Sequence, residues 1–458
     1  KRSPRVLSPP IPSHMLPSTS PSRAYWSLDN KTKSPGHDKP SEMDVADSKS
    51  RRNKGVEKGG RIVNQPHNHK FVTARATGIV LIVALLVGFV WANSPWQESY
   101  RTLHDLPVHI RVGPFQVNRP LIWWINEGLM VFFFLLVGLQ IKREIISGQL
   151  SSWKKVTVPA VAALAGMMVP AAIYLATVGP DEVLRAGWAI PTATDIVLVL
   201  GLLAFLGERI PVALKLFLAA LAIFDDMGAV LIIGLFYGHG FELAPLLLAG
   251  GAMVLMALLT RFGRFGFVPL IVVGLAVWTA SLQAGIEGAI AGIAISVLIP
   301  HKWTKALRHS PLVRLEDALK PWVFWIIVPA FALFNTGINV SQLDIADLLQ
   351  PASIGIILAL FAGKPIGIVG AVFVLDRLGV SVRTRELNWR QLIGASVLAG
   401  VGFTMSVFIA SIAFDDATLI ASSKLAILIA SMCASVAGLV ILAWKPRARE
   451  RRFRAPTS

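Results

Sequence analysis

Five charged residues in otherwise apolar segments are candidates for chemistry. The stretch "LAALAIFDDMGAVLII" places Asp225 and Asp226 side by side, with no Lys or Arg between its ends. The others are Asp195 in "IPTATDIVLVLG", Lys364 in "LFAGKPIGIVG" and Glu287 in "AGIEGAIAG", which lies at the edge of its segment. Charges in such surroundings are costly to keep, so each is a functional hypothesis by default.

The adjacent aspartates suit competition between a proton and a small cation. Burial disfavours the charged form of a carboxylate, and two neighbouring carboxylates oppose each other's ionisation. Protons therefore bind such a pair readily, and the two groups titrate together. A hard cation such as Na⁺ prefers oxygen ligands and can replace the protons, but it cannot share the site with them. No covalent step or organic cofactor is needed.

Enzyme motifs do not fit these segments. "AGKP" resembles the end of a phosphate-binding loop, but Pro365 follows Lys364 where Ser or Thr is required, and the upstream glycine is missing. The apolar segments contain no nucleophile elbow and no His-Glu zinc motif. The sequence thus predicts a transporter without a cofactor and disfavours a hydrolase or an ATPase.

The elements that carry these residues are predicted membrane helices. The chain has 458 residues, of which 54% are hydrophobic and 16% charged, and the apolar residues come in long blocks. Windows of roughly 20 residues, long enough to cross a bilayer, recur about twelve times from Phe71 to Trp444. Only helices satisfy their own backbone in lipid at this hydrophobicity.

The distribution of charge predicts the orientation. The net charge is +17, but basic residues gather in alternate loops, which the positive-inside rule assigns to the cytoplasm. The intervening loops carry acidic residues, such as Asp181, Glu242 and Asp344. Both termini are predicted to be cytoplasmic. The basic set comprises Lys142, Arg143, Lys154, Lys155, Arg209, Lys215, Arg261, Arg264, Lys302, Lys305, Arg308, Arg314, Arg377, Arg383, Arg385 and Arg390.

The sequence divides into a central domain and two tails. Residues 1–70 are rich in Ser, Pro, Lys and Arg and are predicted to form a disordered cytoplasmic tail. Residues 71–446 form the predicted transmembrane domain, and 447–458 a basic cytoplasmic tail. Cys433 is the only cysteine, which excludes an intrachain disulfide.

Between the first two apolar segments, "VHIRVGPFQVN" alternates apolar and polar residues around Gly113 and Pro114. This pattern predicts a short external β-hairpin. The hairpin is either a plain connection or an edge for subunit pairing, because exposed strand edges invite partners. The residues leave these two roles open.

Two apolar segments are predicted to be broken helices. Pro191 stands one turn before Asp195, and proline removes a backbone hydrogen bond. "SVLAGVGFTMSVF" clusters Gly400, Gly402 and Thr404, and glycine weakens a helix by about 1 kcal/mol. Close helix packing is the alternative role for these glycines. Corresponding breaks in two halves of a chain indicate a transporter site.

Several stretches resemble the signatures of the bacterial NhaA family of sodium/proton antiporters, in the family's order. They are "LLVGLQIKREIISGQL", "PTATDI", "LAIFDDMGAVLIIGLFY", "GKPIGI" and "GVGFTMSVFIASIAF". The resemblance covers about Phe71 to Trp444. It implies an all-α polytopic membrane protein of the bacterial inner membrane, with about twelve transmembrane helices, inverted repeats and two crossed, interrupted helices.

The resemblance also implies site roles. Asp226 would be the main carboxylate that binds Na⁺ or Li⁺ and carries a proton, with Asp225 beside it. Thr194 and Asp195 would lie in the unwound part of one broken helix and share the ion site. Lys364 would pair with Asp225, which lowers the cost of both charges. Asp195 and Lys364 would also compensate the partial charges at the interrupted helix ends.

A pH-sensing surface is implied as well, but the chain departs from the family there. It has Gln140 where Glu is common and Glu287 where His is frequent. The pH set-point is therefore not predicted. The implied surface comprises Gln140, Lys142, Arg143, Glu144, Glu287 and Glu316.

The overall prediction is exchange of cytoplasmic Na⁺ or Li⁺ for external H⁺ by alternating access. It includes electrogenic exchange of about two protons per sodium and a homodimer formed through the hairpin near Val108 to Asn118. A cation channel or a carrier for another small substrate is the competing interpretation. A channel filter is usually built from rings of repeated groups, whereas this chain has one asymmetric cluster.

Overall fold

A computed structural model of the chain describes residues 66–112, 115–147, 153–207, 210–237, 242–262, 266–301, 310–380 and 388–444. The predicted N-terminal tail lies outside the described residues up to position 65. The first helix, α2, begins at Pro66 rather than near Phe71. The predicted C-terminal tail at 447–458 also lies outside the described residues.

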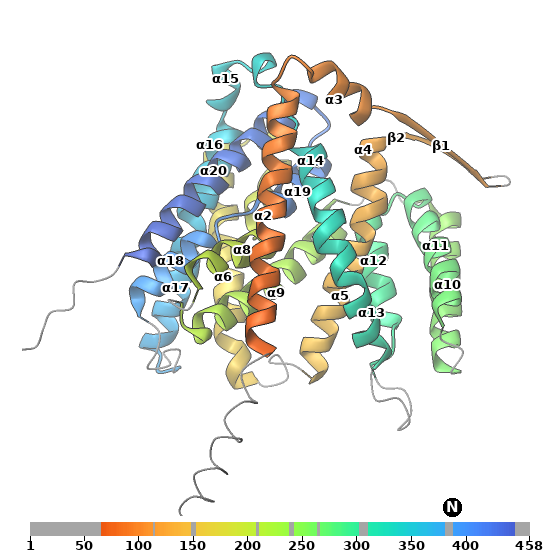
Figure 1. Cartoon of the computed structure of the whole chain (residues 1–458), viewed down its shortest axis with the longest axis horizontal. Coiled ribbons are helices and arrows are strands. Elements are labelled where there is room, and N and C mark those ends of the chain that lie inside the picture. Colours follow the sequence, from red (N-terminus) through yellow and green to blue (C-terminus); the bar gives the residue numbers. More distant parts are fainter. Residues whose placement is uncertain are drawn as a thin grey trace, which may run out of the picture. The chain divides into compact units, whose positions relative to one another are not determined.

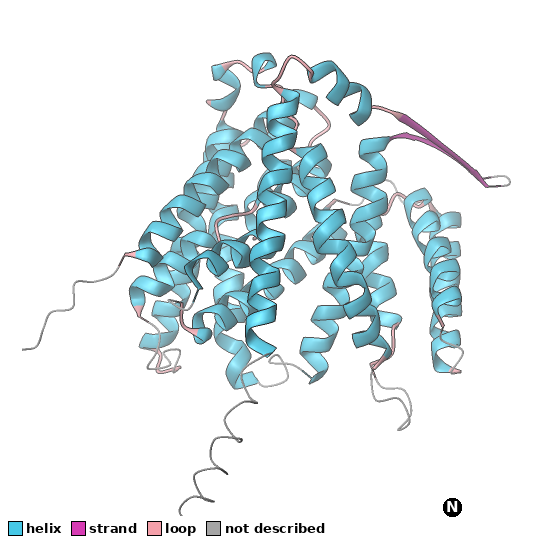
Figure 2. Cartoon of the chain, viewed as in Figure 1, coloured by secondary structure: helices cyan, strands magenta, loops and turns pink. Residues whose placement is uncertain are grey.

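Helices make up nearly all of the described chain, and one hairpin supplies the strands shown in Figure 2. The N-terminal elements are α2 (Pro66–Ala92), α3 (Gln97–His104), β1 (Pro107–Val112), β2 (Phe115–Pro120), α4 (Leu121–Trp123), η1 (Trp124–Leu129), α5 (Met130–Ser147), α6 (Trp153–Val178), α7 (Glu182–Arg185), η3 (Ala186–Thr192), α8 (Ile196–Leu206) and α9 (Val212–Phe236).

The C-terminal elements follow in the same pattern. They are α10 (Leu243–Arg261), α11 (Phe267–Gln283), α12 (Gly288–Leu298), α13 (Pro311–Trp322), η5 (Val323–Ile327), α14 (Val328–Asn335), η6 (Val340–Gln342), α15 (Ile345–Leu348), α16 (Pro351–Leu358), η7 (Ala359–Gly363), α17 (Lys364–Arg377), α18 (Trp389–Leu398), α19 (Phe403–Ala413) and α20 (Ala417–Ala443). The segments η1, η5 and η7 are π-helical turns inside longer helices.

Eight helices of the described chain are long and apolar enough to span a membrane, and two bent pairs raise this to ten. The helices α11 and α12 are apolar but shorter than a full span. The predicted number of about twelve is therefore not confirmed.

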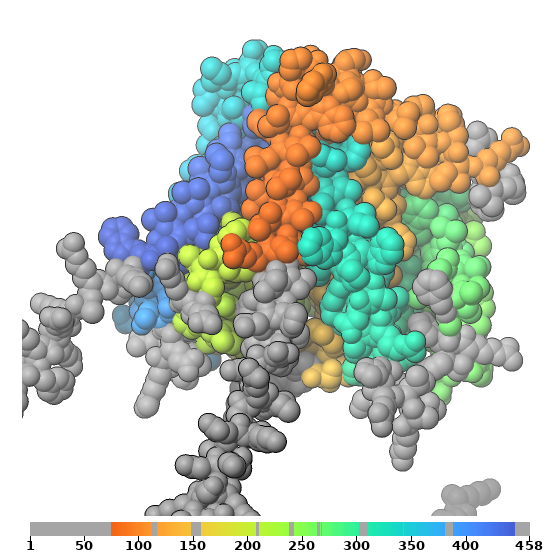
Figure 3. All heavy atoms as spheres, viewed as in Figure 1, coloured from red at the N-terminus to blue at the C-terminus, as the bar shows by residue number. Residues whose placement is uncertain are grey.

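The helices can be divided into two groups by their packing contacts. The site group comprises α6, α8, α9 and α16 to α20 with η3 and η7, and α6 and α20 make many of its contacts. The hairpin group comprises the hairpin, η1, α5 and α10 to α14, in which α5 packs on α12 and α13. Helix α2 packs against both groups, through α8 and α14. In Figure 3 it lies between the surfaces of α20 and α14.

Both predicted breaks are present. The helical segments Glu182–Thr192 and Ile196–Leu206 meet at an angle of 40°, and Trp389–Leu398 and Phe403–Ala413 meet at 42°. Pro191 lies in the 3₁₀ turn that ends the first segment, and Gly402 is the residue before α19. No observation bears on the predicted inverted repeat.

The predicted hairpin is also present. Strands β1 and β2 pair antiparallel, with Val108 opposite Arg119 and Ile110 opposite Val117. Gly113 and Pro114 at its tip lie outside the described residues. Since β2 runs directly into α4, the hairpin marks one face of the membrane domain, called the hairpin face below. Helices α3 and α15 lie on the same face (Figure 1).

Tyr100 fastens α3 to the end of α14. Its hydroxyl lies 2.8 Å from the carbonyl oxygen of Phe334 and 3.0 Å from that of Leu333, and it can donate to either. Burial raises the pKa of Tyr100, so the hydroxyl keeps its proton. These carbonyls have no partner within their own helix, because a helix leaves its last four C=O groups unsatisfied.

Candidate functional site

The first break places Thr194 and Asp195 in extended backbone between η3 and α8. Asp195 is the N-cap of α8: its Oδ1 accepts a hydrogen bond from the backbone N–H of Leu198 at 3.0 Å. Its Oδ2 accepts one from the N–H of Thr404 at 3.2 Å, in the first turn of α19. One carboxylate therefore caps two helix N-termini, where negative charge is favoured.

The two breaks touch each other. The backbone N–H of Asp195 donates to the carbonyl of Val401 at 2.7 Å. Gly400 permits the close approach of a neighbouring helix, because a Cβ there would collide with the carbonyl oxygen of Leu360. The unwound segments of the two interrupted helices are thus in direct contact.

Helix α9 brings the aspartate pair to this crossing. Asp225 and Asp226 lie in its middle, and both side chains are buried. Apolar residues precede and follow the pair, so α9 stays helical without an interruption. Adjacent helical residues point about 100° apart, which gives the two carboxylates different neighbours.

Lys364 reaches the same place from another span. It follows the π-helical turn η7, which shifts the direction of later side chains relative to a regular α-helix. Gly367 allows α17 to pack closely on α6, since a Cβ at that position would collide with the carbonyl oxygen of Ala165. The lysine is fully buried, with 0% exposure.

These side chains form a compact polar network. The Lys364 ammonium donates to Asp225 Oδ2 at 2.6 Å and to Thr194 Oγ1 at 2.9 Å. Thr194 Oγ1 in turn lies 2.6 Å from Asp225 Oδ2 and 2.8 Å from the carbonyl oxygen of Ala399, and its proton can go to one of them at a time. The Lys364–Asp225 ion pair is therefore tied to both unwound segments.

Asp226 differs from its neighbour. Its Oδ1 is buried and has no hydrogen-bond partner among the described residues. It interacts electrostatically with Asp225, Asp195 and Lys364. Asp225 Oδ1 is likewise without a partner in the described part of the chain, although Oδ2 is paired. The site thus combines one neutralised carboxylate with one that no cation faces directly.

This arrangement provides oxygen atoms for a small cation. No group of three or more His, Cys, Asp and Glu side chains converges as a metal-ligand set in the described residues. A cation held here would accordingly use the two aspartates together with hydroxyl or backbone oxygens, of which Thr194 and Ala399 supply the nearest. The same carboxylates can hold protons instead.

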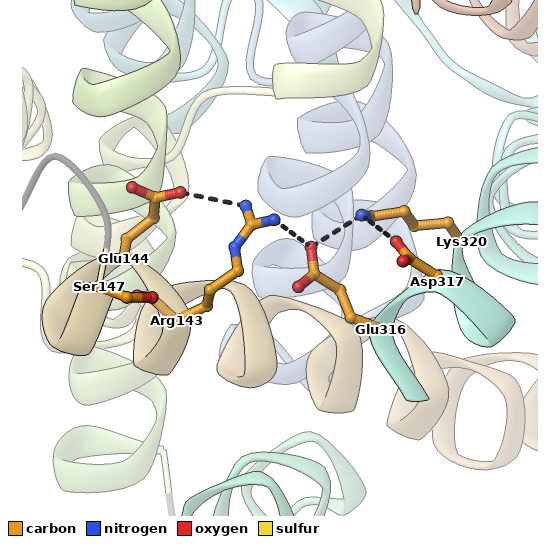
Figure 4. A network of polar contacts seen from close by, with 6 residues as sticks. All are labelled: Arg143, Glu144, Ser147, Glu316, Asp317 and Lys320. Carbon is orange, nitrogen blue, oxygen red and sulfur yellow. Dashed lines mark hydrogen bonds and ion pairs between the residues drawn. The ribbon is translucent and has the colours of Figure 1, made fainter. Parts of the chain in front are cut away.

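A second charged network lies at the opposite end of α5 from the hairpin (Figure 4). Glu316 on α13 is fully buried and pairs with Arg143 at 3.1 Å and with Lys320 at 2.9 Å. Arg143 also contacts Glu144 at 3.0 Å, and Lys320 contacts Asp317 at 2.8 Å. The network joins α5 to α13.

The remaining members of the implied pH-sensing surface lie elsewhere. Lys142 donates to the carbonyls of Val297 and Ile299, both at 2.5 Å, and so closes the C-terminal end of α12. Gln140 is half-buried two residues earlier on α5. Glu287 is not brought to the Arg143 network. It is the N-cap of α12, where the backbone N–H of the next residue, Gly288, donates to Glu127 Oε2 at 2.8 Å, near the hairpin end of the α5 span.

Sequence reasoning missed three polar residues inside the spans. Lys424 stands in the apolar stretch "IASSKLAILIAS" of α20, and its ammonium donates to Asn335 Oδ1 at 3.2 Å. Asn335 Nδ2 donates to Asn126 Oδ1 at 2.8 Å. The signal was a lysine within a predicted span, the same criterion that selected Lys364.

The fold and the site define a class. The chain is a multi-pass membrane protein whose buried charged residues meet where two interrupted helices touch. Cation and proton binding is the chemistry that these residues can perform without a covalent step.

Comparison with known proteins specifies the family. The family described as Na⁺/H⁺ antiporter 1 matches residues 69–442. A curated relative from Maricaulis maris, named Na(+)/H(+) antiporter NhaA, is 45% identical over 366 residues, covering 80% of this chain and 90% of that protein. A relative of the same name from Serratia proteamaculans is 43% identical over 377 residues, covering 82% and 97%. The chain therefore belongs to the Na⁺/H⁺ antiporter 1 family.

A more distant likeness is found among solved structures. The sodium proton antiporter MjNhaP1 from Methanocaldococcus jannaschii is 16% identical to this chain, with a TM-score of 0.48. The comparison covers 82% of this chain and 98% of that one.

Proposed function

We propose that this protein exchanges Na⁺ or Li⁺ for H⁺ across the bacterial inner membrane by alternating access, as a secondary active transporter. One observation carries the proposal: an Asp225–Lys364 ion pair lies at the contact of two broken helices, beside Asp226, whose Oδ1 has no partner among the described residues. The relatives' names, which describe sodium/proton antiporters, support the same function.

Coupling follows from competition at Asp225. A sodium ion that binds both aspartates opposes the hold of Lys364 on Asp225 Oδ2. When Asp226 loses its proton, the site gains the charge that the cation needs. When a proton returns, the cation is released. The Thr194 hydroxyl lies between Lys364 and the Ala399 carbonyl, so it can follow either arrangement by changing its acceptor.

The proposed stoichiometry is about two protons for each sodium. One route takes both protons from Asp225 and Asp226. The other takes one from Asp226 and one from Lys364 after the lysine leaves Asp225. Both routes move more positive charge with the protons than with the sodium, so exchange is electrogenic.

The proposed orientation places the hairpin face outside and both termini in the cytoplasm. The charged network of Arg143, Glu316 and Lys320 then lies toward the cytoplasm, in agreement with the positive-inside rule. We assign regulation by pH to this network, because the buried Glu316 carboxylate pairs with Arg143 and Lys320 and so joins α5 to α13. Glu287 is distant from it.

We also propose a homodimer that pairs through the hairpin near Val108 to Asn118. The two strands form an isolated sheet with open edges, and Ile110 is 42% exposed. Exposed edges favour strand pairing with a second copy. Removal of residues 107–120 should convert dimers into monomers in detergent, as measured by light scattering, while unchanged dimers would contradict this role.

The test of exchange is uptake of labelled Na⁺ into proteoliposomes under an imposed proton gradient. An antiporter takes up sodium against its own gradient when the interior is acidic, and uptake collapses when a protonophore removes the gradient. A channel would only equilibrate sodium, and a carrier for an organic substrate would leave it outside. Either result would refute the proposal. Unlabelled Li⁺ added outside should compete for uptake.

A further inference from the structure

A half-buried lysine within a membrane helix, outside the ion site, carries a further inference. Lys424 lies two turns into α20, on the hairpin side of the membrane domain. No carboxylate lies within ion-pair distance of it among the described residues. Its recorded partner is Asn335, an uncharged amide on a different helix. A lysine that lacks a counter-charge within a membrane helix is costly, so its retention needs a reason.

The partners of Lys424 explain how the charge is tolerated. Asn335 is the last residue of α14, where the helix presents its partial negative charge, and a cation is favoured there. The same Asn335 donates from Nδ2 to Asn126 Oδ1 at 2.8 Å and to the Phe331 carbonyl at 3.1 Å. Asn335 is almost fully buried. The side-chain oxygen Oδ1 of Asn335 is therefore held toward Lys424.

The chain of contacts crosses the boundary between the two helix groups. Lys424 belongs to the site group, in which α20 packs on α16, α18, α19 and η7, and η7 leads directly into Lys364. Asn335 and Asn126 belong to the hairpin group, in which α14 packs on η1 and α5. We define the Lys424 latch as the three side chains of Lys424, Asn335 and Asn126.

The position of the latch matters for alternating access. All three residues lie toward the hairpin face: Asn126 comes one turn after β2 joins α4, Asn335 ends the helix that Tyr100 fastens, and Lys424 follows the start of α20. For the ion site to open toward this face, the two helix groups must separate there. Separation would break the charge-assisted hydrogen bond of Lys424, which is stronger than a neutral one.

We propose that the Lys424 latch holds the hairpin side of the transporter closed and that it opens once in each transport cycle. Lys424 is thus a positioning residue, which acts on the access equilibrium without touching the ion. The proposal rests on the exchange function proposed above.

The first test fixes the latch covalently. In a Cys433→Ser background, the double variant Lys424→Cys with Asn335→Cys is treated with a short bifunctional methanethiosulfonate reagent. Linking the two helix groups should lower sodium/proton exchange at least tenfold, and a reductant should restore it. The matched control is Asn126→Cys with Asn335→Cys, which links two residues of the same group. After linking, this control variant should keep more than half of the exchange rate that it has before linking.

Two outcomes would overturn the latch. One is full exchange when mass spectrometry shows that positions 424 and 335 are linked. The other is equal arrest in both linked pairs, because general stiffening would then explain the effect. The unlinked double variants serve as their own reference. If neither they nor the Cys433→Ser parent exchange ions, the proposed function fails instead, so the two failures are distinguishable.

A second pair of variants covers the case in which the cysteine pair does not fold. Lys424→Gln keeps a donor for Asn335, whereas Lys424→Met keeps the length and loses the donor. Without the latch, the ion site faces the hairpin side for a larger fraction of the time. A lower Na⁺ concentration at that face should then half-saturate transport. The KM for Na⁺ presented at that face should fall about tenfold for Lys424→Met and stay within about threefold for Lys424→Gln. Equal values in the two variants would refute a hydrogen-bonded latch.

Discussion

At the scale of single residues, the two adjacent aspartates have different partners. Asp225 has the Lys364 ammonium and the Thr194 hydroxyl at one oxygen, whereas Asp226 Oδ1 has no partner in the described residues. A buried pair is less costly than an isolated buried charge. Asp226 is consequently the carboxylate that most needs a mobile cation, either a proton or a sodium ion, to neutralise its charge.

The variant Asp226→Asn tests this assignment. Asparagine has nearly the same size, but it has neither the negative charge nor an exchangeable proton. Sodium/proton exchange should fall to background in proteoliposomes, while the protein inserts and keeps its thermal stability. The control is Asp317→Asn, which changes an exposed carboxylate in the other network and should retain exchange. Sodium-dependent proton release by purified Asp226→Asn at the parent's level would remove the central assignment.

Lys364 should matter for stability as well as for transport. Lys364→Ala leaves Asp225 buried without its partner, and breaking a buried pair on one side costs about 3–5 kcal/mol. The melting temperature in detergent should therefore fall sharply, whereas Lys364→Arg should keep much of the fold and some exchange. Adding Asp225→Asn to Lys364→Ala should recover part of the loss, because the remaining partner is no longer charged.

The variants at positions 225 and 364, alone and combined, form a double-mutant cycle. Coupling between two residues appears as a deviation from additivity. Additive losses in the Asp225→Asn and Lys364→Ala variants would mean that the 2.6 Å ion pair contributes nothing specific to the folded state. An Ala variant as stable as the parent would lead to the same conclusion.

At the scale of elements, the site depends on helix backbones that approach each other more closely than a Cβ atom at the contact would allow. The break before α19 lies against the η7 span, and Gly400 faces the Leu360 carbonyl there. Gly400→Ala should lower both the melting temperature and exchange, because backbone atoms must move apart. Gly370→Ala is the matched control on α17, since a Cβ at that position meets open space. Equal stability of the two variants would argue against the close crossing.

The Glu316 network couples two elements of the hairpin group. Gln at position 316 removes the charge that attracts Arg143 and Lys320. Glu316→Gln should therefore alter the dependence of the exchange rate on pH. The measurement is exchange rate against pH in proteoliposomes. A profile that keeps the parent's pH dependence would exclude this network from regulation.

The sequence predicted the charged residues and the helix breaks of the site better than the number of membrane spans or the contacts between helices. Buried charges, Pro191 and the glycines near Gly400 could be recognised because each violates a rule of membrane helices. The lengths of α11 and α12 could not be predicted, since hydropathy alone does not fix the residue at which a helix begins or ends. The contact of Lys424 with Asn335 joins positions 89 residues apart, so it depends on helix packing that composition does not encode.

At the scale of the whole molecule, two sets of side chains connect helices at opposite ends. The Lys424 latch joins α20 to α14 near the hairpin face, and the Glu316 network joins α5 to α13 at the other end. The buried ion site lies in the site group. The latch connects this group to the hairpin group, whereas the Glu316 network lies within the hairpin group. A motion that opens the hairpin side therefore need not disturb the Glu316 network.

The charge balance of the whole cycle can be measured directly. If about two protons move for each sodium, one net charge crosses the membrane, and 100 mV then contributes about 2.3 kcal/mol to each turnover. At a fixed pH gradient, exchange should run faster in the direction that moves the two protons toward the negative side. Valinomycin with equal potassium on both sides should abolish that advantage in tight vesicles. Liposomes without protein give the leak, which is subtracted. Identical rates at zero and at negative-inside potential would mean one proton per sodium, carried by Asp226 alone, with Lys364 keeping its proton throughout.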